Sequence, residues 1–295
     1  MTNTKIVVRI CGGLGNQLFT YAAARRLSLV NNAELVIDDE TGFLRDHIYR
    51  RSYGLDAFSI PARKATNSEK LKPFERMRRW FLRGQAKRIP FERRAYVYQE
   101  ELDFDPRLLQ LQPQGTVYME GYWQSENYFV DVANTIRSDL RLSSILSASN
   151  LETAAAIRNC CAVALHMRWF DPPGTAGQNT PSDYYRRAVA FFESRIHQPH
   201  YFVFSDNAEA VREYLTLPVR NATYVNHNGP DSSPYADLWL MSQCDHFIIA
   251  NSTFSWWGAW LAANPHKIIV APSVTTVSAP AWTFRGLIPE AWHRI

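Results

Sequence analysis

Short runs of apolar residues recur along the 295-residue chain, and most are followed by a polar or glycine-containing turn and a longer amphipathic segment. Runs of this kind predict β-strands at residues 6–10, 34–37, 162–165, 201–204, 247–250 and 267–271. The alternation of short strands with helix-length segments is typical of parallel βαβ units. The pattern therefore predicts an α/β protein.

Apolar residues with helical spacing mark the segments between these strands. Leu14, Leu18 and Tyr21 predict a helix that begins at Gly15 or Asn16. Further helices are predicted at 126–140, 183–196, 208–215, 235–243 and 254–263. Residues 40–120 alternate less regularly, and a polar stretch at 143–150 separates two βα series. We therefore expect two Rossmann-like domains, 1–147 and 148–295.

Composition places the chain among globular proteins, with 46% hydrophobic and 20% charged residues. No apolar run approaches the roughly 18 residues of a membrane-spanning helix, and the first residues show no secretory signal. We therefore expect a cytoplasmic protein, and we expect no nucleic-acid partner.

The four cysteines lack CxxC spacing, and no zinc or nucleophile motif occurs, so the sequence predicts no metal centre and no cofactor.

Charge is unevenly distributed along the chain. Residues 63–94 contain twelve Lys and Arg against three Glu, a net +9 within a chain of net +4, which leaves −5 for the rest. Inside this window Phe74, Met77 and Phe81 have helical spacing among arginines, which predicts a basic amphipathic helix at 73–83. One interpretation is peripheral contact with the anionic surface of the inner membrane. The alternative is a solvated helix that packs on its own domain.

A glycine-rich turn, Cys11-Gly-Gly-Leu-Gly-Asn-Gln17, separates the first strand from the first helix. Glycines at such a turn let a ligand approach the backbone, so Gly13 and Gly15 are candidates for ligand binding. The third glycine of a dinucleotide fingerprint is replaced by Leu18. Asn16 can direct an amide into a cleft at the start of the helix. The alternative is simple turn chemistry.

The stretch from His166 to Asp171 follows the strand at 162–165, and alternation places His166 and Arg168 on one face. A guanidinium at this point can bind phosphate oxygens with two parallel hydrogen bonds. Asp171 can orient Arg168 or accept a proton. The alternative is a surface ion pair at the end of a strand.

The segment Asn251-Ser-Thr-Phe-Ser-Trp-Trp-Gly-Ala-Trp260 follows another apolar run and opens a helix. Hydroxyls and backbone N–H groups at the start of a helix form an anion cradle, which makes Asn251, Ser252, Thr253, Phe254 and Ser255 candidates for phosphate binding. The three tryptophans of this segment brace the turn or are simply core residues.

Further aspartates have both a functional and a structural interpretation. Asp206, at the end of the strand at 201–204, is either a helix cap or a ligand of a nucleoside. Asp237 is either an exposed helical residue or a second nucleoside ligand. Asp103-Phe-Asp105 matches the DxD triplet that some glycosyltransferases use to hold a metal, although a three-residue match arises easily by chance.

Five of these stretches together carry a resemblance to a known family. They are the turn from Cys11 to Phe19, Glu120-Gly-Tyr-Trp-Gln-Ser-Glu126, His166-Met-Arg168, Phe204-Ser-Asp206 and the segment from Asn251 to Leu261. In this order they resemble bacterial α-1,2-fucosyltransferases of glycosyltransferase family 11. The resemblance spans nearly the whole chain, and its first and last motifs are the most specific.

The resemblance implies a GT-B-like fold of two domains with a cleft between them, in which the C-terminal domain binds GDP-β-L-fucose and the N-terminal domain lies on the acceptor side. It implies inverting transfer without a metal or cofactor. Arg168 would hold the β-phosphate with His166 beside it, and Ser252 to Ser255 would bind other phosphate oxygens. Asp206 and Asp237 would contact the nucleoside. Asn16 would orient the fucose and the acceptor hydroxyl.

The chain departs from the family pattern His-x-Arg-Arg-x-Asp, which often has Gly before the Asp: Trp169 stands where the second Arg is common, and Phe170 precedes Asp171. Arg9 and Lys267 are candidates to replace this cation. A general base is not singled out: Asp171 is the nearest carboxylate, and Asp38 and Asp39 are alternatives.

The leading hypothesis is transfer of L-fucose to O2 of a terminal galactoside on an oligosaccharide or polysaccharide precursor. The alternatives are a transferase for another sugar nucleotide or acceptor, and a non-catalytic glycan- or nucleotide-binding module.

Overall fold

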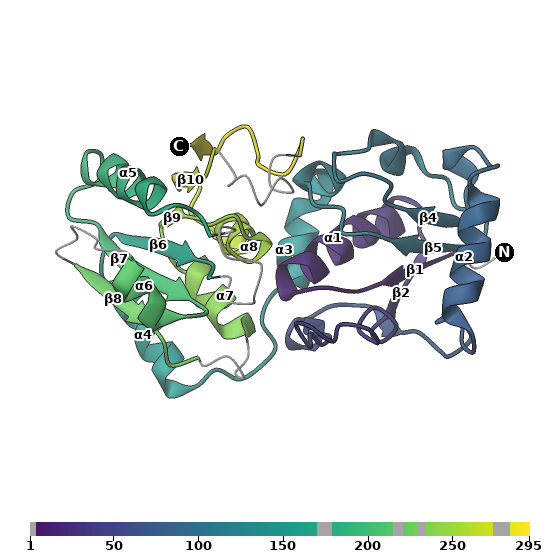
Figure 1. The fold of residues 1–295 in the computed structure, drawn as a ribbon, viewed down its shortest axis with the longest axis horizontal. Coiled ribbons are helices and arrows are strands. Elements are labelled where there is room, and N and C mark those ends of the chain that lie inside the picture. Colours follow the sequence, from purple (N-terminus) through teal and green to yellow (C-terminus); the bar gives the residue numbers. More distant parts are fainter. Residues whose placement is uncertain (1–3, 170–178, 215–220, 229–233, 274–283) are drawn as a thin grey trace. The chain divides into compact units, whose positions relative to one another are not determined.

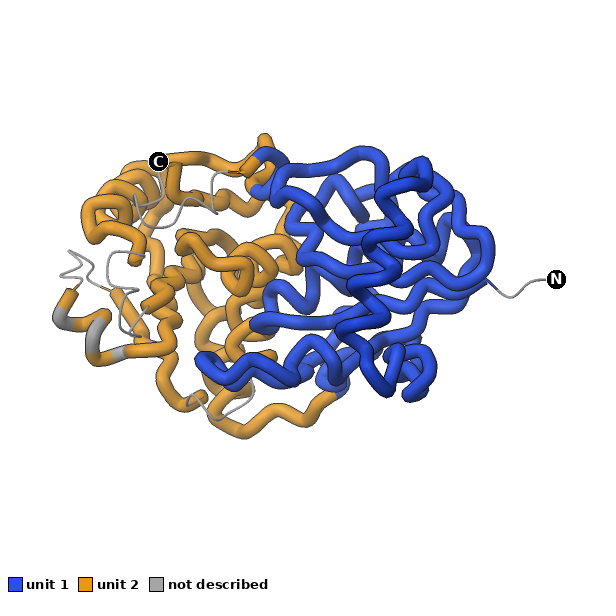
Figure 2. The backbone as a smooth tube through the Cα atoms, turned by 45° about the vertical axis from the view of Figure 1, so that its right-hand side comes forward, with its two compact units in different colours: residues 1–143, 285–287 blue, residues 144–284, 288–295 orange. Residues whose placement is uncertain are grey.

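The computed structural model describes residues 4–169, 179–214, 221–228, 234–273 and 284–295. The chain forms two compact units (Figure 2). Unit 1 is Met1–Ser143 with Arg285–Leu287, and unit 2 is Ser144–Phe284 with Ile288–Ile295. The division lies slightly before the predicted boundary at 147. The return of Arg285–Leu287 to unit 1 is a feature that the sequence pattern did not predict.

The sheet of unit 1 is parallel throughout its described strands (Figure 1). It is built from β1 (Lys5–Arg9), β2 (Glu34–Asp38), β3 (Arg63–Lys64), β4 (Tyr96–Tyr98) and β5 (Thr116–Glu120), in the order β3-β2-β1-β5-β4. In β1, Ile6 and Val8 are fully buried, as expected for a central strand covered on both faces. The carboxyl ends of all five strands therefore lie at the same edge of the sheet.

Two of these strands correct the prediction that residues 40–120 are irregular. β5 pairs with the central strand β1, and β4 pairs with β5 on its other side. Both strands are only three to five residues long and lie far along the chain from β1. Their role comes from long-range parallel pairing, which hydrophobic periodicity in a short window does not reveal.

The helices of unit 1 are α1 (Leu14–Val30), α2 (Glu75–Ala86) and α3 (Ala133–Asp139), with 3₁₀ turns at Leu55–Ala57, Phe91–Arg93, Pro106–Gln110, Glu126–Tyr128 and Val130–Val132. The predicted single helix at 126–140 is wrong, because two 3₁₀ turns precede α3. Phe129 separates these turns with a non-helical φ of −150° and is fully buried, so its side-chain packing prevails over a continuous helix.

Unit 2 alternates helices and strands: α4 (Ala148–Arg158), β6 (Ala162–Met167), α5 (Ser182–Glu193), β7 (His200–Ser205), α6 (Ala208–Tyr214), β8 (Ala222–Val225), α7 (Pro234–Ser242), β9 (His246–Ile248), α8 (Thr253–Leu261), β10 (Ile269–Ala271) and β11 (His293–Arg294). Its described sheet is parallel, in the order β11-β10-β9-β6-β7-β8. The predicted strands and helices of this half are confirmed, and α4, β8 and β11 are additions.

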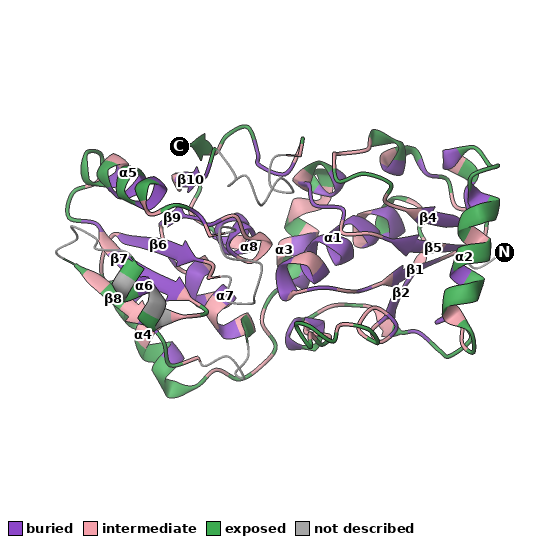
Figure 3. Ribbon diagram, viewed as in Figure 1, coloured by how far each residue is buried: buried purple, intermediate pink, exposed green. Residues whose placement is uncertain are grey.

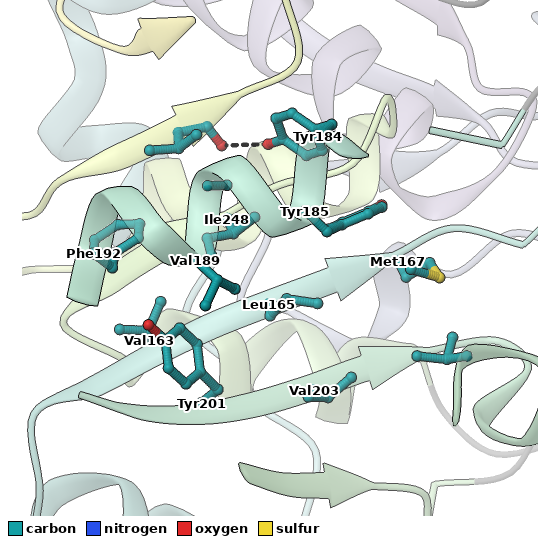
Figure 4. Close-up of a cluster of buried hydrophobic side chains, with 13 residues drawn as sticks. Val163, Leu165, Met167, Tyr184, Tyr185, Val189, Phe192, Tyr201, Val203 and Ile248 are labelled. Carbon is teal, nitrogen blue, oxygen red and sulfur yellow. Dashed lines mark hydrogen bonds between the residues drawn. The ribbon is translucent and has the colours of Figure 1, made fainter. Parts of the chain in front are cut away.

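The core between α5 and the sheet explains why β6 is held firmly (Figure 4). Tyr185, Val189 and Phe192 follow one another at helical spacing, and they pack against the face of β6 that carries Leu165 and Met167. Each large apolar side chain buried in this way stabilises the fold by about 1.5–3 kcal/mol. This packing sets the orientation of β6. It thereby also orients the side chains on the opposite face of the strand and the residues just beyond its end.

Candidate active site

His166 lies near the end of β6, and Arg168 follows directly after the strand. Met167 belongs to the core with Tyr185, whereas the ring of His166 lies 5.7 Å from the ring of Phe254 in α8. Burial, with a further contribution from the charge of Arg168, lowers the pKa of His166 to about 3. Its Nδ1 atom is buried and has no hydrogen-bond partner in the described part of the chain. The site thus holds a neutral imidazole with an unused polar atom.

Asp206, which follows β7, binds the residues that follow β6. Its carboxylate accepts a hydrogen bond from Arg168 Nη1 and a second one, at 2.8 Å, from the backbone N–H of Trp169. Both side chains of the ion pair remain about one-third exposed. Asp206 therefore positions Arg168, a role that sequence reasoning gave to Asp171. Asp171 lies outside the described residues.

Trp169, which stands at the position of the second family Arg, packs into the protein. Its ring contacts Tyr214 of α6 edge to face, with the ring centroids 5.3 Å apart. It is half-buried against the core cluster that contains Met167. An aromatic contact therefore occupies the position at which a second cation was expected.

The loop between β9 and α8 presents a half-exposed helix start. Asn251 Oδ1 accepts a hydrogen bond from Thr180 Oγ1 at 3.1 Å. Ser252 has an extended backbone (φ −140°, ψ 124°), and its hydroxyl does not cap the helix within the described structure. Ser252, Thr253 and Phe254 are all partly accessible. Backbone N–H groups in the first turn of a helix carry partial positive charge, so this turn can bind an anion.

Ser255 has a structural role, which corrects its prediction as a donor ligand. It is fully buried, and its hydroxyl donates to the carbonyl of Ser252 at 3.1 Å. Behind it, the tryptophans at 256, 257 and 260 are buried: Trp256 stacks on Trp260, and Trp257 meets both of them edge to face. Gly258 permits close packing, since a Cβ there would lie 3.0 Å from Met241 Cβ of α7.

Lys267 is also a structural residue, because its Nζ donates to the carbonyls of Ala259 and Ala262 at 2.8 and 2.7 Å. It therefore neutralises the C-terminal end of α8. It does not replace the missing family cation.

Asp237 in α7 is largely buried, contrary to the interpretation as an exposed helical residue. Its Oδ1 accepts a hydrogen bond from Asn228 Nδ2 at 2.7 Å, and Asn228 in turn exchanges hydrogen bonds with Asn150. Burial raises the pKa of Asp237 to about 6, although the hydrogen bond from Asn228 opposes this shift. The carboxyl group is thus part of a polar network near the end of β8.

In unit 1 the glycine-rich turn is held by Gly12, which sequence reasoning did not single out. Gly12 has φ +77°, and a Cβ there would lie 3.0 Å from both Asn16 Nδ2 and a ring carbon of Tyr122. Gly13 precedes α1 and is accessible, whereas Gly15 is buried in the first helical turn and offers no exposed surface to a ligand. Asn16 Oδ1 accepts a hydrogen bond from Gln124 Nε2 at 2.7 Å, which fixes the amide.

Ion pairs involve the last residues of β1, β2 and β5, which are Arg9, Asp38 and Glu120. Glu120 accepts hydrogen bonds from Arg9, from Tyr96, and from Arg83 Nη2 at 2.5 Å. Burial alone would raise the pKa of Glu120, but the hydrogen bonds from Tyr96 and Arg83 outweigh it and the pKa is lowered. Arg9 is therefore committed to this cluster, which corrects its prediction as a replacement cation.

Asp38, the last residue of β2, and Asp39, which follows it, are similarly occupied, so neither is suited to be the general base. Asp38 is fully buried, and its Oδ2 accepts a hydrogen bond from Arg79 Nη2 at 2.7 Å. Asp39 Oδ1 lies 2.7 Å from Lys70 Nζ. Burial would raise the pKa of Asp39, but the hydrogen bond from Lys70 and its charge lower it overall. A carboxylate with a lowered pKa is a weaker base.

An open hollow of about 300 Å³ adjoins this cluster, and Cys11, Gln99, Glu101 and Tyr122 are among its lining residues. Gln99 Oε1 accepts hydrogen bonds from the backbone N–H groups of Tyr122 and Trp123, at 2.9 and 3.0 Å. The Nε2 atom of Gln99 is buried without a partner in the described structure. Gln99 thus lines the hollow with its side chain held in place by two backbone N–H groups.

The DxD triplet is held by arginines. Asp103 accepts hydrogen bonds from the backbone N–H and Nε of Arg285, at 2.8 and 2.9 Å, and Asp105 is bound by Arg107. Among the described residues no group of three His, Cys, Asp or Glu side chains is arranged to hold a metal ion. The triplet thus serves the fold of unit 1.

Comparison with known proteins identifies the family. The family model described as glycosyl transferase family 11 matches residues 60–280. The chain belongs to glycosyltransferase family 11. It is similar to an alpha-1,2-colitosyltransferase of Escherichia coli, with 27% identity over 98% of both chains. It is also similar to galactoside alpha-(1,2)-fucosyltransferase 1 of Saimiri boliviensis boliviensis, with 28% identity over 50% of this chain and 43% of that protein.

The fold is also similar to a solved structure, the fucosyltransferase NodZ from Bradyrhizobium. The TM-score is 0.52 at 13% sequence identity, and the match covers 91% of this chain and 96% of that chain. Together with the two parallel sheets and their alternating helices, this likeness confirms the predicted GT-B-like α/β fold class.

Proposed function

We propose that this glycosyltransferase transfers L-fucose from GDP-β-L-fucose to O2 of a terminal galactoside on an oligosaccharide or polysaccharide precursor. Family membership and the named relatives support a sugar transferase of this kind. The observation that carries the proposal is the grouping of Arg168, neutral His166 and the start of α8 at one edge of the unit 2 sheet. In open α/β sheets this edge is the usual place for ligands.

The donor diphosphate would bind between these groups. Arg168, oriented by Asp206, would make charge-assisted hydrogen bonds to the β-phosphate. The N-terminal turn of α8, at Ser252, Thr253 and Phe254, would bind further phosphate oxygens. The buried Nδ1 of His166 would donate or accept one hydrogen bond without adding charge. We assign Asp237 and Asn251 to the donor only as residues that shape the surrounding pocket wall.

Catalysis would rest on stabilisation of the departing GDP. Breaking the bond between fucose and phosphate leaves negative charge on the diphosphate, and Arg168 with the α8 dipole would stabilise it in fixed geometry. These protein groups supply the positive charge for which other transferases use a metal, so we propose metal-independent transfer. Direct attack by the acceptor hydroxyl then inverts the anomeric centre.

The acceptor would bind on unit 1. The hollow beside the glycine-rich turn offers the carboxylate of Glu101 to sugar hydroxyls, and the ring of Tyr122 to the face of a sugar. Asn16, fixed by Gln124, lies on the same turn. Asp171 stays a proposal for the general base.

The test is fucosyl transfer to lactose in the presence of EDTA, with analysis of the product linkage. We expect Arg168→Ala to lower kcat/KM at least about 100-fold, since removal of one transition-state donor commonly has effects of this size. Arg158→Ala, on the surface of α4, is the matched control and should retain activity. Arg168→Ala activity within about tenfold of wild type would refute the role of Arg168, and loss of all wild-type activity in EDTA would refute metal independence.

A second candidate donor is GDP-colitose, favoured by the full-length similarity to a colitosyltransferase and by Trp169 in place of the family Arg. Colitose lacks one hydroxyl of L-fucose, so a pocket that hydrogen-bonds this hydroxyl distinguishes the two sugars. Paired kcat/KM measurements with both donors decide between them. A preference of more than about tenfold for GDP-colitose would replace the fucose proposal, and donor binding without hydrolysis or transfer would favour a binding module.

A further inference from the structure

Helix α2 turns its large apolar side chains toward solvent, while two of its arginines, Arg79 and Arg83, reach toward the protein. Along this 12-residue helix only Arg79 and Ala86 are buried. Phe74, directly before the helix, is 68% exposed, and Met77, Trp80 and Phe81 are 62%, 74% and 57% exposed. In Figure 3 most of the α2 ribbon has the colour of exposed residues. This is the reverse of an ordinary amphipathic surface helix.

The buried side of α2 explains the reversal. Arg79 reaches the fully buried carboxylate of Asp38, and Arg83, one turn later, reaches Glu120. Two buried carboxylates require cations, because an unpaired buried charge is strongly destabilising. The i and i+4 positions that face the sheet are therefore taken by arginines. Met77, Trp80 and Phe81, spaced by three and four residues, are left on the outer face.

The cations of residues 63–94 fall into two groups, those that form ion pairs and those that do not. Arg63, Lys64, Lys70, Lys72 and Arg94 each form ion pairs with acidic residues. In contrast, Arg76 and Arg78 on α2 are exposed and form no ion pair with any described residue, and the same holds for Lys87, Arg88 and Arg93 after the helix. Arg45, also exposed, borders an open hollow of about 520 Å³ together with Phe74, Met77 and Trp80.

We infer that this face of α2, formed by Phe74, Arg76, Met77, Arg78, Trp80 and Phe81, docks on an anionic lipid bilayer. Exposed apolar patches mark interaction sites, and an aromatic stripe between arginines fits the boundary between headgroups and acyl chains. Charge complementarity selects this partner. A second copy of the chain would oppose one set of unpaired arginines with another, whereas anionic headgroups neutralise them.

None of the helices in the described part of the chain is both long and apolar enough to cross a bilayer. The inferred contact is therefore peripheral. It is independent of the donor and acceptor assignments, because every residue of the docking face lies outside the groups proposed to bind substrates.

The test is sedimentation of the full chain with phosphatidylcholine vesicles, with and without phosphatidylglycerol. We expect binding only to the vesicles that contain phosphatidylglycerol, and weaker binding at high salt. Trp80→Ser with Phe81→Ser, and separately Arg76→Glu with Arg78→Glu, should each lower the partition coefficient at least about tenfold. The altered side chains are exposed, so the melting temperature should stay unchanged and fucosyl transfer to soluble lactose should persist.

Two substitutions serve as matched controls. Ile145→Ser removes an apolar side chain that is 97% exposed in unit 2, and Arg158→Glu reverses an exposed charge on α4. Both should bind vesicles as the wild type does. Equal binding to neutral vesicles, or full binding by the Trp80 and Phe81 variant, would overturn the inference. So would a wild-type dimer in analytical ultracentrifugation that this variant abolishes while vesicle binding is absent, because the occupant would then be a second copy.

Discussion

Substitution of His166 by Gln tests whether the proposed donor site contains a neutral imidazole. His166 is 5% exposed, and burial with the charge of Arg168 lowers its pKa from 6.5 to about 3. Gln has a similar size and no titration in this range. The substitution therefore removes one ionisable group while the surrounding residues stay the same.

The pH dependence of stability follows from proton linkage. In the unfolded chain His166 binds a proton near pH 6.5, whereas in the folded chain it does so only near pH 3. Between these values the unfolded state holds the additional proton, so acidification favours unfolding. The contribution is fully present above pH 6.5 and is lost as the pH falls. One pH unit corresponds to about 1.4 kcal/mol, and the unfolded imidazole is already half-protonated at its pKa, so acidification from pH 6.5 to about 4.5 should lower the free energy of unfolding by about 2.3 kcal/mol.

Asp237 changes the free energy of unfolding with pH in the opposite direction to His166. Its pKa is raised from 3.8 to about 6, so its contribution is present at low pH and is lost as the pH rises through 6. The wild-type profile alone therefore combines two opposing slopes. The difference between wild type and His166→Gln removes the Asp237 contribution, because both proteins retain that residue.

The measurement is guanidinium unfolding followed by tryptophan fluorescence at several pH values, with the transition of unit 2 fitted separately. We expect wild type to lose about 2.3 kcal/mol relative to His166→Gln between pH 6.5 and about 4.5. A difference that changes by less than about 0.7 kcal/mol over this range would mean that the folded imidazole titrates almost normally. A buried neutral His166 beside Arg168 would then be refuted.

Two further substitutions test the structural assignments in unit 1. Gly12→Ala should lower stability by about 1–3 kcal/mol, because φ is +77° and the new Cβ meets two side chains at 3.0 Å. Gly13→Ala, whose Cβ would meet only a flexible side chain at 3.8 Å, should change the melting temperature little, and equal effects would contradict the argument. Arg79→Ala should cost about 3–5 kcal/mol, since it leaves Asp38 buried without its cation. Arg76→Ala on the exposed side should stay within about 0.5 kcal/mol in chemical unfolding, and similar losses for both would argue against the inward orientation of Arg79.

Local sequence determined most of unit 2. The strands that contain His166, Phe204 and Phe247 are buried parallel strands, which read as continuous apolar runs and are easily found. The same pattern locates the residues just after each strand. For this reason the apolar pattern alone places Arg168 and Ser252 correctly, beyond the ends of β6 and β9.

Local sequence patterns did not predict strand pairs or ion pairs between residues that lie far apart in the chain. β5 is an interior strand beside β1 in unit 1, yet Thr116–Glu120 is too short and too polar at its ends to be found by periodicity. Asp206 binds Arg168 across two neighbouring strands, 38 residues apart, so no local motif reports the pair. The same holds for Asp38 and Arg79, which turned a candidate base into a buried ion pair.

The sequence by itself therefore determined the βα alternation, the turns that end the strands, and the presence of a basic amphipathic helix. Only the tertiary structure decided which charges face inward. In α2, Asp38 and Glu120 draw Arg79 and Arg83 to the sheet, because burying a carboxylate without a cation costs more free energy than exposing Trp80 and Phe81. Periodicity records that a helix has two faces, whereas the charges of the neighbouring strands determine which face is buried.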